Sequence, residues 1–87
     1  MSARVRMYAT ATCPFCMRAE ALLRRKGAAV EKIRVDLDPS LREEMIALSG
    51  RRTVPQIFID GRHVGGCDDL YELDHAGGLD PLLAGTD

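Results

Sequence analysis

Apolar residues in this 87-residue chain switch between alternate and helical spacing, and the order of the switches leaves few folds open. Alternation around Val5 and Met7 predicts a first strand, and helical spacing over 14–26 predicts a helix after it. A second alternating stretch, 32–37, predicts the next strand. Because the helix between them returns the chain to the same end of the sheet, the two strands should pair in parallel.

A second helix is expected to start at Asp38-Pro39-Ser40 and to end at Gly50. Ser40 and Glu43 have the spacing of a capping box. The inward face of this helix is predicted from three apolar residues at helical spacing, which are Leu41, Met45 and Leu48.

The rest of the chain predicts a hairpin and a third helix. Asp60-Gly61 after the apolar run 56–59 is a strong hairpin signal, so His63-Val64 should pair antiparallel with that run. The third helix should end at Gly77-Gly78, and residues 84–87 should form a frayed tail. Residues 1–87 are therefore predicted to form one α/β domain, a four-stranded mixed sheet in the order β-α-β-α-β-β-α with flanking helices, which is the thioredoxin-like arrangement.

The charge balance excludes some classes of partner. The chain has 12 Lys and Arg against 13 Asp and Glu, a net charge of −1, which does not fit a surface that coats nucleic acid. Residues 1–34 carry eight basic and two acidic side chains, and residues 35–87 carry four and eleven, which predicts a bipolar surface. No apolar run approaches the roughly 18 residues of a membrane span. We expect a monomer that binds neither nucleic acid nor a membrane.

Two of the three cysteines form a Cys13-x-x-Cys16 pair at the start of the first predicted helix. An odd number of cysteines does not fit a disulfide framework, which favours a reducing, cytoplasmic compartment. Free N–H groups and the helix dipole stabilise a negative sulfur at this position, and cysteines there have pKa values of about 3.5–7.5 rather than about 8.5. An acidic thiol also leaves a mixed disulfide faster. We predict that Cys13 is the reactive sulfur and that the less exposed Cys16 resolves it.

Two other interpretations of this pair stay open, a pair of inert core cysteines and half of a zinc site. A zinc site needs about four nitrogen or sulfur ligands, and only Cys67, His63 and His75 remain to complete it. We expect no bound metal.

Two further segments have the composition of a binding site. If the bond between Val54 and Pro55 in Thr53-Val54-Pro55 is cis, the Val54 N–H and C=O are free to pair with an extended peptide that contains cysteine. The simpler alternative is a proline at a strand entrance. In Gly65-Gly66-Cys67-Asp68-Asp69, glycines and a helix N-terminus can accommodate a carboxylate, and an aspartate can bind an ammonium group. Here the alternative is an ordinary helix cap.

These three segments together resemble the glutaredoxins, specifically the short bacterial dithiol class, and the resemblance extends from the first strand to Leu83. It implies that Cys13 is the nucleophile and Cys16 the resolving cysteine. It also implies a glutathione site with contributions from three parts of the chain, which are Phe15 (commonly tyrosine in the family), Thr53, Val54 and Pro55, and Cys67, Asp68 and Asp69.

One position departs from the family pattern. Glutaredoxins usually carry a lysine or arginine three residues before the nucleophile, where it contacts the glycine carboxylate of glutathione, and this chain has Thr10 there. Loss of such a charge-assisted contact costs about 1.5–3 kcal/mol. Arg51 and Arg52 are the candidates to replace it.

The resemblance implies a glutathione-dependent thiol–disulfide oxidoreductase that reduces protein disulfides and glutathionylated proteins and contributes to redox homeostasis. Glutathione would be the reducing co-substrate, with no tightly bound cofactor. One alternative is an electron donor driven by thioredoxin reductase, with ribonucleotide reductase as a candidate partner, which Thr10 favours. The other is a carrier in which two chains share a [2Fe–2S] cluster through Cys13 and two glutathiones, which Pro14 disfavours.

Overall fold

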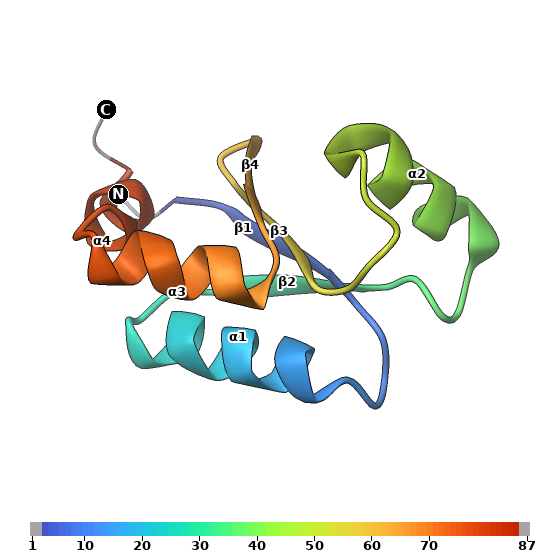
Figure 1. The fold of residues 1–87 in the computed structure, drawn as a ribbon, viewed down its shortest axis with the longest axis horizontal. Coiled ribbons are helices and arrows are strands. Elements are labelled where there is room, and N and C mark those ends of the chain that lie inside the picture. Colours follow the sequence, from blue (N-terminus) through green and yellow to red (C-terminus); the bar gives the residue numbers. More distant parts are fainter. Residues whose placement is uncertain (1–2, 86–87) are drawn as a thin grey trace.

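The computed structural model describes residues 3–85. Its four strands form one sheet in the order β2-β1-β3-β4, with helices on both faces (Figure 1). The elements in chain order are β1 (Val5–Ala9), α1 (Pro14–Arg25), β2 (Val30–Arg34), α2 (Pro39–Ser49), β3 (Gln56–Ile59), β4 (Arg62–Gly65), α3 (Cys67–His75) and α4 (Leu79–Ala84). The predicted fold class, a mixed four-stranded sheet flanked by helices, is confirmed.

The strand pairings follow the connections between the strands. β1 pairs in parallel with β2 across the α1 crossover, and β3 pairs antiparallel with both β1 and β4. The predicted hairpin turn at Asp60-Gly61 joins β3 to β4, and both residues have positive φ, as a tight two-residue turn requires. Within residues 3–85, no helix combines the length and the apolarity that crossing a membrane requires.

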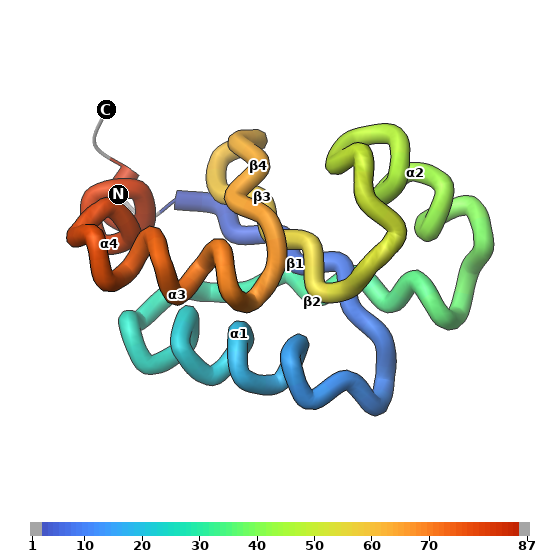
Figure 2. Tube along the Cα trace, in the orientation of Figure 1, coloured from blue at the N-terminus to red at the C-terminus, as the bar shows by residue number. Residues whose placement is uncertain are grey.

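Alternate residues of the central strands pack into separate cores on the two faces of the sheet. Val5 and Met7 pack against α1, α3 and α4, whereas Tyr8 packs against α2. Figures 1 and 2 show α1 and α3 side by side on one face and α2 alone on the other. The predicted inward face of α1 is confirmed, because its four buried residues are Cys16, Ala19, Leu22 and Leu23.

The α2 side departs from the predictions at two apolar residues. The second strand ends at Arg34 instead of continuing to 37, and Leu37 lies in the following turn with 71% of its surface exposed. Leu48 was expected to face inward and is 54% exposed, while Met45 is the buried residue of this helix. The core between α2 and the sheet is much smaller than the core on the α1 side. Helical spacing alone therefore predicts more buried residues on α2 than the sheet can cover.

The start of α2 and the C-terminal end of the chain also differ from the predictions. The cap of α2 is Asp38, whose Oδ1 accepts hydrogen bonds from the Ser40 N–H at 2.9 Å and the Ser40 hydroxyl at 2.8 Å, so the Ser40–Glu43 capping box is wrong. The C-terminal segment forms α4, which extends to Ala84, and Gly85 is its C-cap. The remainder of the expected frayed tail, residues 86 and 87, lies outside the described residues.

The two leucines Leu23 and Leu48 test this placement of the core. Leu23→Ala should lower the free energy of unfolding by about 2–5 kcal/mol, because it opens a cavity in the fully buried α1 side. Leu48→Ala should change it by less than about 0.5 kcal/mol, because the side chain lies largely in solvent. Urea denaturation followed by circular dichroism measures both, and equal losses would contradict the assignment of the two faces.

Candidate active site

Cys13 caps the N-terminus of α1 with its sulfur. β1 delivers the chain to a short loop, and Cys13 has extended backbone angles, φ −123° and ψ 107°, at the cap position. Its Sγ accepts a hydrogen bond from the Cys16 N–H at 3.1 Å, and Pro14 occupies the first helical turn, where a missing N–H costs nothing. The sulfur therefore lies where the backbone donors and the helix dipole stabilise negative charge.

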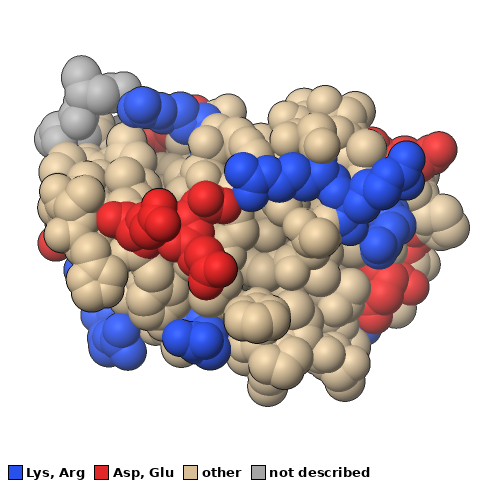
Figure 3. Space-filling model, in the orientation of Figure 1, with Lys and Arg blue, Asp and Glu red and all other residues tan. Residues whose placement is uncertain are grey.

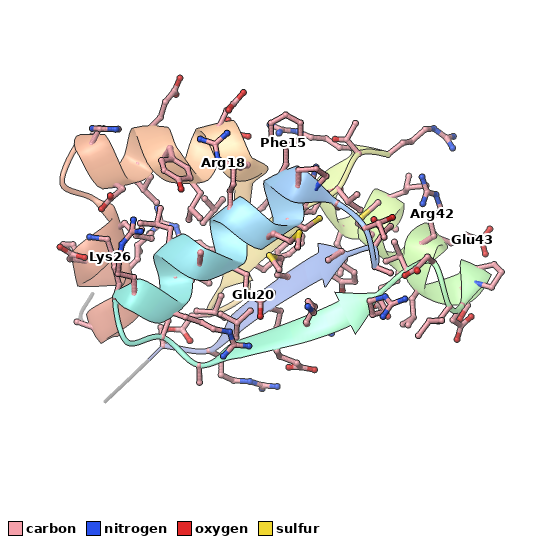
Figure 4. The ribbon with its side chains drawn as sticks, turned by 90° about the horizontal axis from the view of Figure 1, so that it is seen from below. Phe15, Arg18, Glu20, Lys26, Arg42 and Glu43 are labelled. Atoms are coloured by element: carbon pink, nitrogen blue, oxygen red, sulfur yellow. The ribbon has the colours of Figure 1, made fainter. Side chains whose placement is uncertain are left out.

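Cys13 is itself buried, with 8% of its surface exposed, and Cys16 is buried more deeply. It is 3% exposed on the inner side of α1, and burial, followed by the neighbouring Cys13 sulfur, raises the pKa of its thiol to about 12. Figure 4 shows the first turn of α1 with the Phe15 ring at its outer edge and sulfur atoms beneath the helix. All three cysteines are free thiols. The pair thus combines one sulfur at a helix terminus with one thiol kept protonated at neutral pH.

The Thr53-Val54-Pro55 segment lies directly beside Cys13. The Val54–Pro55 peptide bond is cis, and the Val54 carbonyl oxygen is 3.9 Å from the Cys13 Sγ. The Val54 N–H has no acceptor among residues 3–85. The Val54 carbonyl oxygen thus accepts a long hydrogen bond from the Cys13 thiol and the Val54 N–H is unpaired among these residues, so a peptide laid along the segment could pair with both groups.

A cleft of about 210 Å³ opens next to this segment. Its walls come from the first turn of α1, the chain before β3 and the start of α3. The residues that line it are Phe15, Arg51, Thr53, Val54, Pro55, Gly66, Cys67, Asp68 and Asp69. The structure therefore brings together predicted residues that are up to 54 positions apart in the sequence, from Phe15 to Asp69. A larger cleft of about 380 Å³ lies between β4, α3 and α4. Neither cleft is lined by Cys13 or Cys16, but the smaller one includes Val54, whose carbonyl oxygen is 3.9 Å from the Cys13 Sγ.

The two arginine candidates differ in position. The Arg51 Nη1 lies 2.8 Å from the Asp69 Oδ2. The same oxygen accepts a hydrogen bond from the Gly66 N–H at 2.9 Å. Both contacts hold the pKa of Asp69 below its ordinary value. Arg52 is exposed and does not line the cleft, although its carbonyl accepts a hydrogen bond from Arg42 at 3.3 Å. Arg51 is therefore the cation that the structure places in the cleft.

Cys67 is buried and Thr10 is half-buried. Cys67 packs in the core on the α1 side, and burial raises the pKa of its thiol. Thr10 is half-buried outside the cleft lining, and its backbone lowers the pKa of Cys16, against the larger effect of burial. Among residues 3–85, no group of three or more His, Cys, Asp or Glu side chains is arranged to hold a metal ion.

Gln56 belongs to the site and was not predicted from the sequence. Its side chain is fully buried, and its Nε2 donates to the Thr53 carbonyl at 3.0 Å and to the Thr53 hydroxyl oxygen at 3.2 Å. Its Oε1 lies 2.8 Å from the His63 Nε2, which carries the proton because an amide oxygen only accepts. Gln56 thus holds the backbone and the side chain of Thr53 in place from the protein interior. The available signal was a lone amide in an otherwise apolar strand, directly after Pro55.

Comparison with known proteins agrees with this geometry. The family model described as Glutaredoxin matches residues 5–64. Glutaredoxin 3 of Escherichia coli K12 is 59% identical over 81 residues, which cover 93% of this chain and 98% of that protein. The glutaredoxin of Pseudomonas aeruginosa is 53% identical over 78 residues, with 90% and 93% covered. The chain belongs to the glutaredoxin family.

Solved structures of glutaredoxins have the same fold. The solution structure of the Brucella melitensis glutaredoxin superimposes with a TM-score of 0.84 at 53% identity, covering 95% of this chain and 90% of that one. A buckwheat glutaredoxin–glutathione complex gives a TM-score of 0.86 at 31% identity, with 93% and 76% covered. This glutaredoxin is accordingly a thiol–disulfide oxidoreductase.

The environments of the cysteines predict selective alkylation. At about pH 8, iodoacetamide should modify Cys13 first and leave Cys16 and Cys67 largely unmodified, because burial raises the pKa of both of these thiols. Peptide mapping by mass spectrometry at short reaction times measures the order. A Cys13→Ser variant is the control and should incorporate almost no label. Equal labelling of Cys13 and Cys16 would show that the two environments do not differ as described.

Replacement of Gln56 should weaken both the fold and the site. Gln56→Met keeps the volume but removes the donors to Thr53 and the acceptor for His63, so we expect a loss of about 1–3 kcal/mol in the free energy of unfolding. The KM for a glutathionylated substrate should rise while the alkylation rate of Cys13 stays the same. A change in stability with no change in KM would limit Gln56 to a structural role.

Proposed function

We propose that this glutaredoxin uses glutathione to reduce glutathionylated proteins and protein disulfides in the cytoplasm, without a tightly bound cofactor. The observation that carries the proposal is the Cys13 Sγ at the α1 cap, 3.9 Å from a backbone carbonyl that borders the cleft. The buckwheat glutaredoxin, of the same fold, is described as a complex with glutathione.

The cleft offers a partner for each part of glutathione. The Val54 N–H and C=O can pair with the backbone of its cysteine residue, which brings the two sulfurs together. At the other end, the N–H groups that begin α3 suit the α-carboxylate of the γ-glutamyl residue. Asp68 is the available carboxylate for its ammonium group, because Asp69 already bonds Arg51 and Gly66.

The glycine carboxylate of glutathione needs a cation, and Thr10 does not supply one. Arg51 is the proposed replacement, since its guanidinium is in the cleft. Arg51 already contacts the Asp69 carboxylate at 2.8 Å. When the glycine carboxylate of glutathione binds, it either displaces Asp69 from the guanidinium or shares the guanidinium with it.

The reaction with a glutathionylated protein needs only Cys13. Its thiolate attacks the glutathione sulfur, the mixed disulfide breaks, and the electron pair leaves on the protein sulfur, which takes a proton from water. Cys13 is then joined to glutathione. A second glutathione thiolate attacks that disulfide and releases oxidised glutathione, and the Cys13 thiolate is restored.

Reduction of a protein disulfide also needs Cys16. Attack by Cys13 leaves the protein joined to Cys13 and frees one protein thiol, and Cys16 then attacks the Cys13 sulfur to release the second. Two glutathiones reopen the Cys13–Cys16 disulfide, donate two electrons and leave as oxidised glutathione.

The environment of Cys16 fits this sequence of steps. Part of the rise in the Cys16 pKa comes from the free Cys13 sulfur, through a hydrogen bond and its charge. Once Cys13 is in a mixed disulfide, these two contributions disappear, and burial alone raises the pKa, against the Thr10 backbone and Lys32, which lower it. Cys16 therefore becomes more acidic at the step at which its thiolate is needed.

Two serine variants test the proposal. Cys13→Ser should lose at least about 1,000-fold in glutathione-dependent reduction of a glutathionylated peptide, because no nucleophile remains. Cys16→Ser should keep that activity and lose reduction of a protein disulfide. A coupled assay with glutathione reductase and NADPH measures both. Full activity of Cys13→Ser, or turnover supported by thioredoxin reductase but not by glutathione, would contradict the proposed function.

A further inference from the structure

Two groups of opposite charge flank the cleft. Figure 3 shows blue side chains over α2 and the segment after it, with some red side chains beside them, and a group of red side chains over α3. The blue and red groups come close together at one point, and uncharged surface lies below it. We name the first group the basic ridge, which consists of Arg42, Arg51 and Arg52. The second is the acidic ridge, which consists of Asp68, Asp69 and Glu72. Asp68 and Glu72 are four residues apart on a helix and therefore share a face.

Most charge on the two ridges is not neutralised within the protein. Arg51 and Asp69 form an ion pair across the cleft. Arg52, Asp68 and Glu72 are exposed and form no ion pair within residues 3–85. By contrast, Arg24, Lys26 and Arg34, on other parts of the surface, each have a carboxylate within 3 Å. Arg52, Asp68 and Glu72 therefore present unpaired charges of opposite sign on the two sides of the cleft.

The backbone of Val54 fixes the direction in which a substrate segment runs between the ridges. Pro55 has no N–H, so backbone hydrogen bonds between this segment and a substrate cannot continue past Val54. Val54 must therefore provide both the donor and the acceptor. A residue that exchanges its N–H and its C=O with a single partner residue does so in an antiparallel pair. The bound segment therefore runs opposite to the 53–55 segment, with its cysteine beside Val54 and Cys13.

This direction assigns each side of the substrate cysteine to one ridge. Residues after the cysteine lie along Thr53 and reach Arg52 and the basic ridge. Residues before the cysteine pass Pro55 and reach the start of α3, because the Pro55 carbonyl oxygen is within 3.4 Å of the position that a side chain on Gly66 would occupy. The acidic ridge begins two residues beyond Gly66, at Asp68.

We propose, on the basis of the function proposed above, that this site selects extended cysteine-containing segments with basic residues before the cysteine and acidic residues after it. The two ridges recognise the order of the charges, not the net charge. The thiol–disulfide steps themselves are unchanged, because recognition comes from side chains outside the dithiol.

Three short peptides test the inference, each supplied as a disulfide between two identical copies, so that the peptide and not glutathione occupies the cleft when Cys13 attacks. One has two lysines before its central cysteine and two glutamates after it, the second has the reverse order, and the third has glutamine at all four positions. At about 20 mM ionic strength the first should have kcat/KM about five- to tenfold above the second, with the neutral peptide between them. At about 1 M salt the ratio should approach one, because screening removes the contribution of exposed charges.

Charge-reversal variants locate the effect. Arg52→Glu combined with Glu72→Lys should abolish the preference between the two charged peptides, because each ridge then carries one unpaired positive and one unpaired negative charge beside the Arg51–Asp69 pair. The matched control is Arg25→Glu combined with Glu31→Lys, which makes the same exchange at the end of α1 and on β2, neither of which lines the cleft. The control should keep the preference for the first peptide.

The outcomes separate the two proposals. Equal kcat/KM for the two charged peptides at low salt, with the neutral peptide reduced, would overturn the charge-order inference and leave the proposed function standing. A preference for the reverse order, or one that survives about 1 M salt, would also overturn the inference. Failure to reduce the neutral peptide with glutathione would overturn the proposed function and this inference with it.

Discussion

The hydrogen bond from the Cys16 N–H to the Cys13 Sγ, at 3.1 Å, is the contact on which the site depends. It makes a sulfur atom the cap of α1, so the group that stabilises the helix is also the group that reacts. A capping acceptor contributes about 0.5–2 kcal/mol, and a charged one is stronger than a neutral one. Any change in the bonding of the Cys13 sulfur therefore also changes the cap of α1.

The short spacing of the two cysteines gives them different environments. Cys13 lies just before the helix begins, whereas Cys16 is one turn further and faces the core with Ala19 and Leu23. The two sulfurs are both buried, Cys13 at 8% exposed and Cys16 at 3%, but only the Cys13 sulfur lies at the helix end, where it accepts a backbone N–H.

The strongest local signals in the sequence were enough to predict the fold. The Asp60-Gly61 turn and the Cys13-x-x-Cys16 pair each depend on a few adjacent residues, and both lie where the sequence placed them. Leu37 and Leu48 were misplaced because periodicity does not reveal how far the sheet extends above a helix. Gln56 was missed for a related reason. Its role arises only when the β3–β4 register brings His63 within 2.8 Å, which no single segment encodes.

The absence of a basic residue at position 10 can be understood from the same tertiary arrangement. Arg51 and Asp69 are separated by 18 positions, yet their contact of 2.8 Å places a guanidinium at the cleft. The two side chains are 47% and 40% exposed, and an ion pair of this kind contributes only about 0–1 kcal/mol. The guanidinium is thus held in position at little energetic cost, and an incoming carboxylate can compete for it. In the proposed glutathione site, the cation has moved from the loop before α1 to the segment after α2.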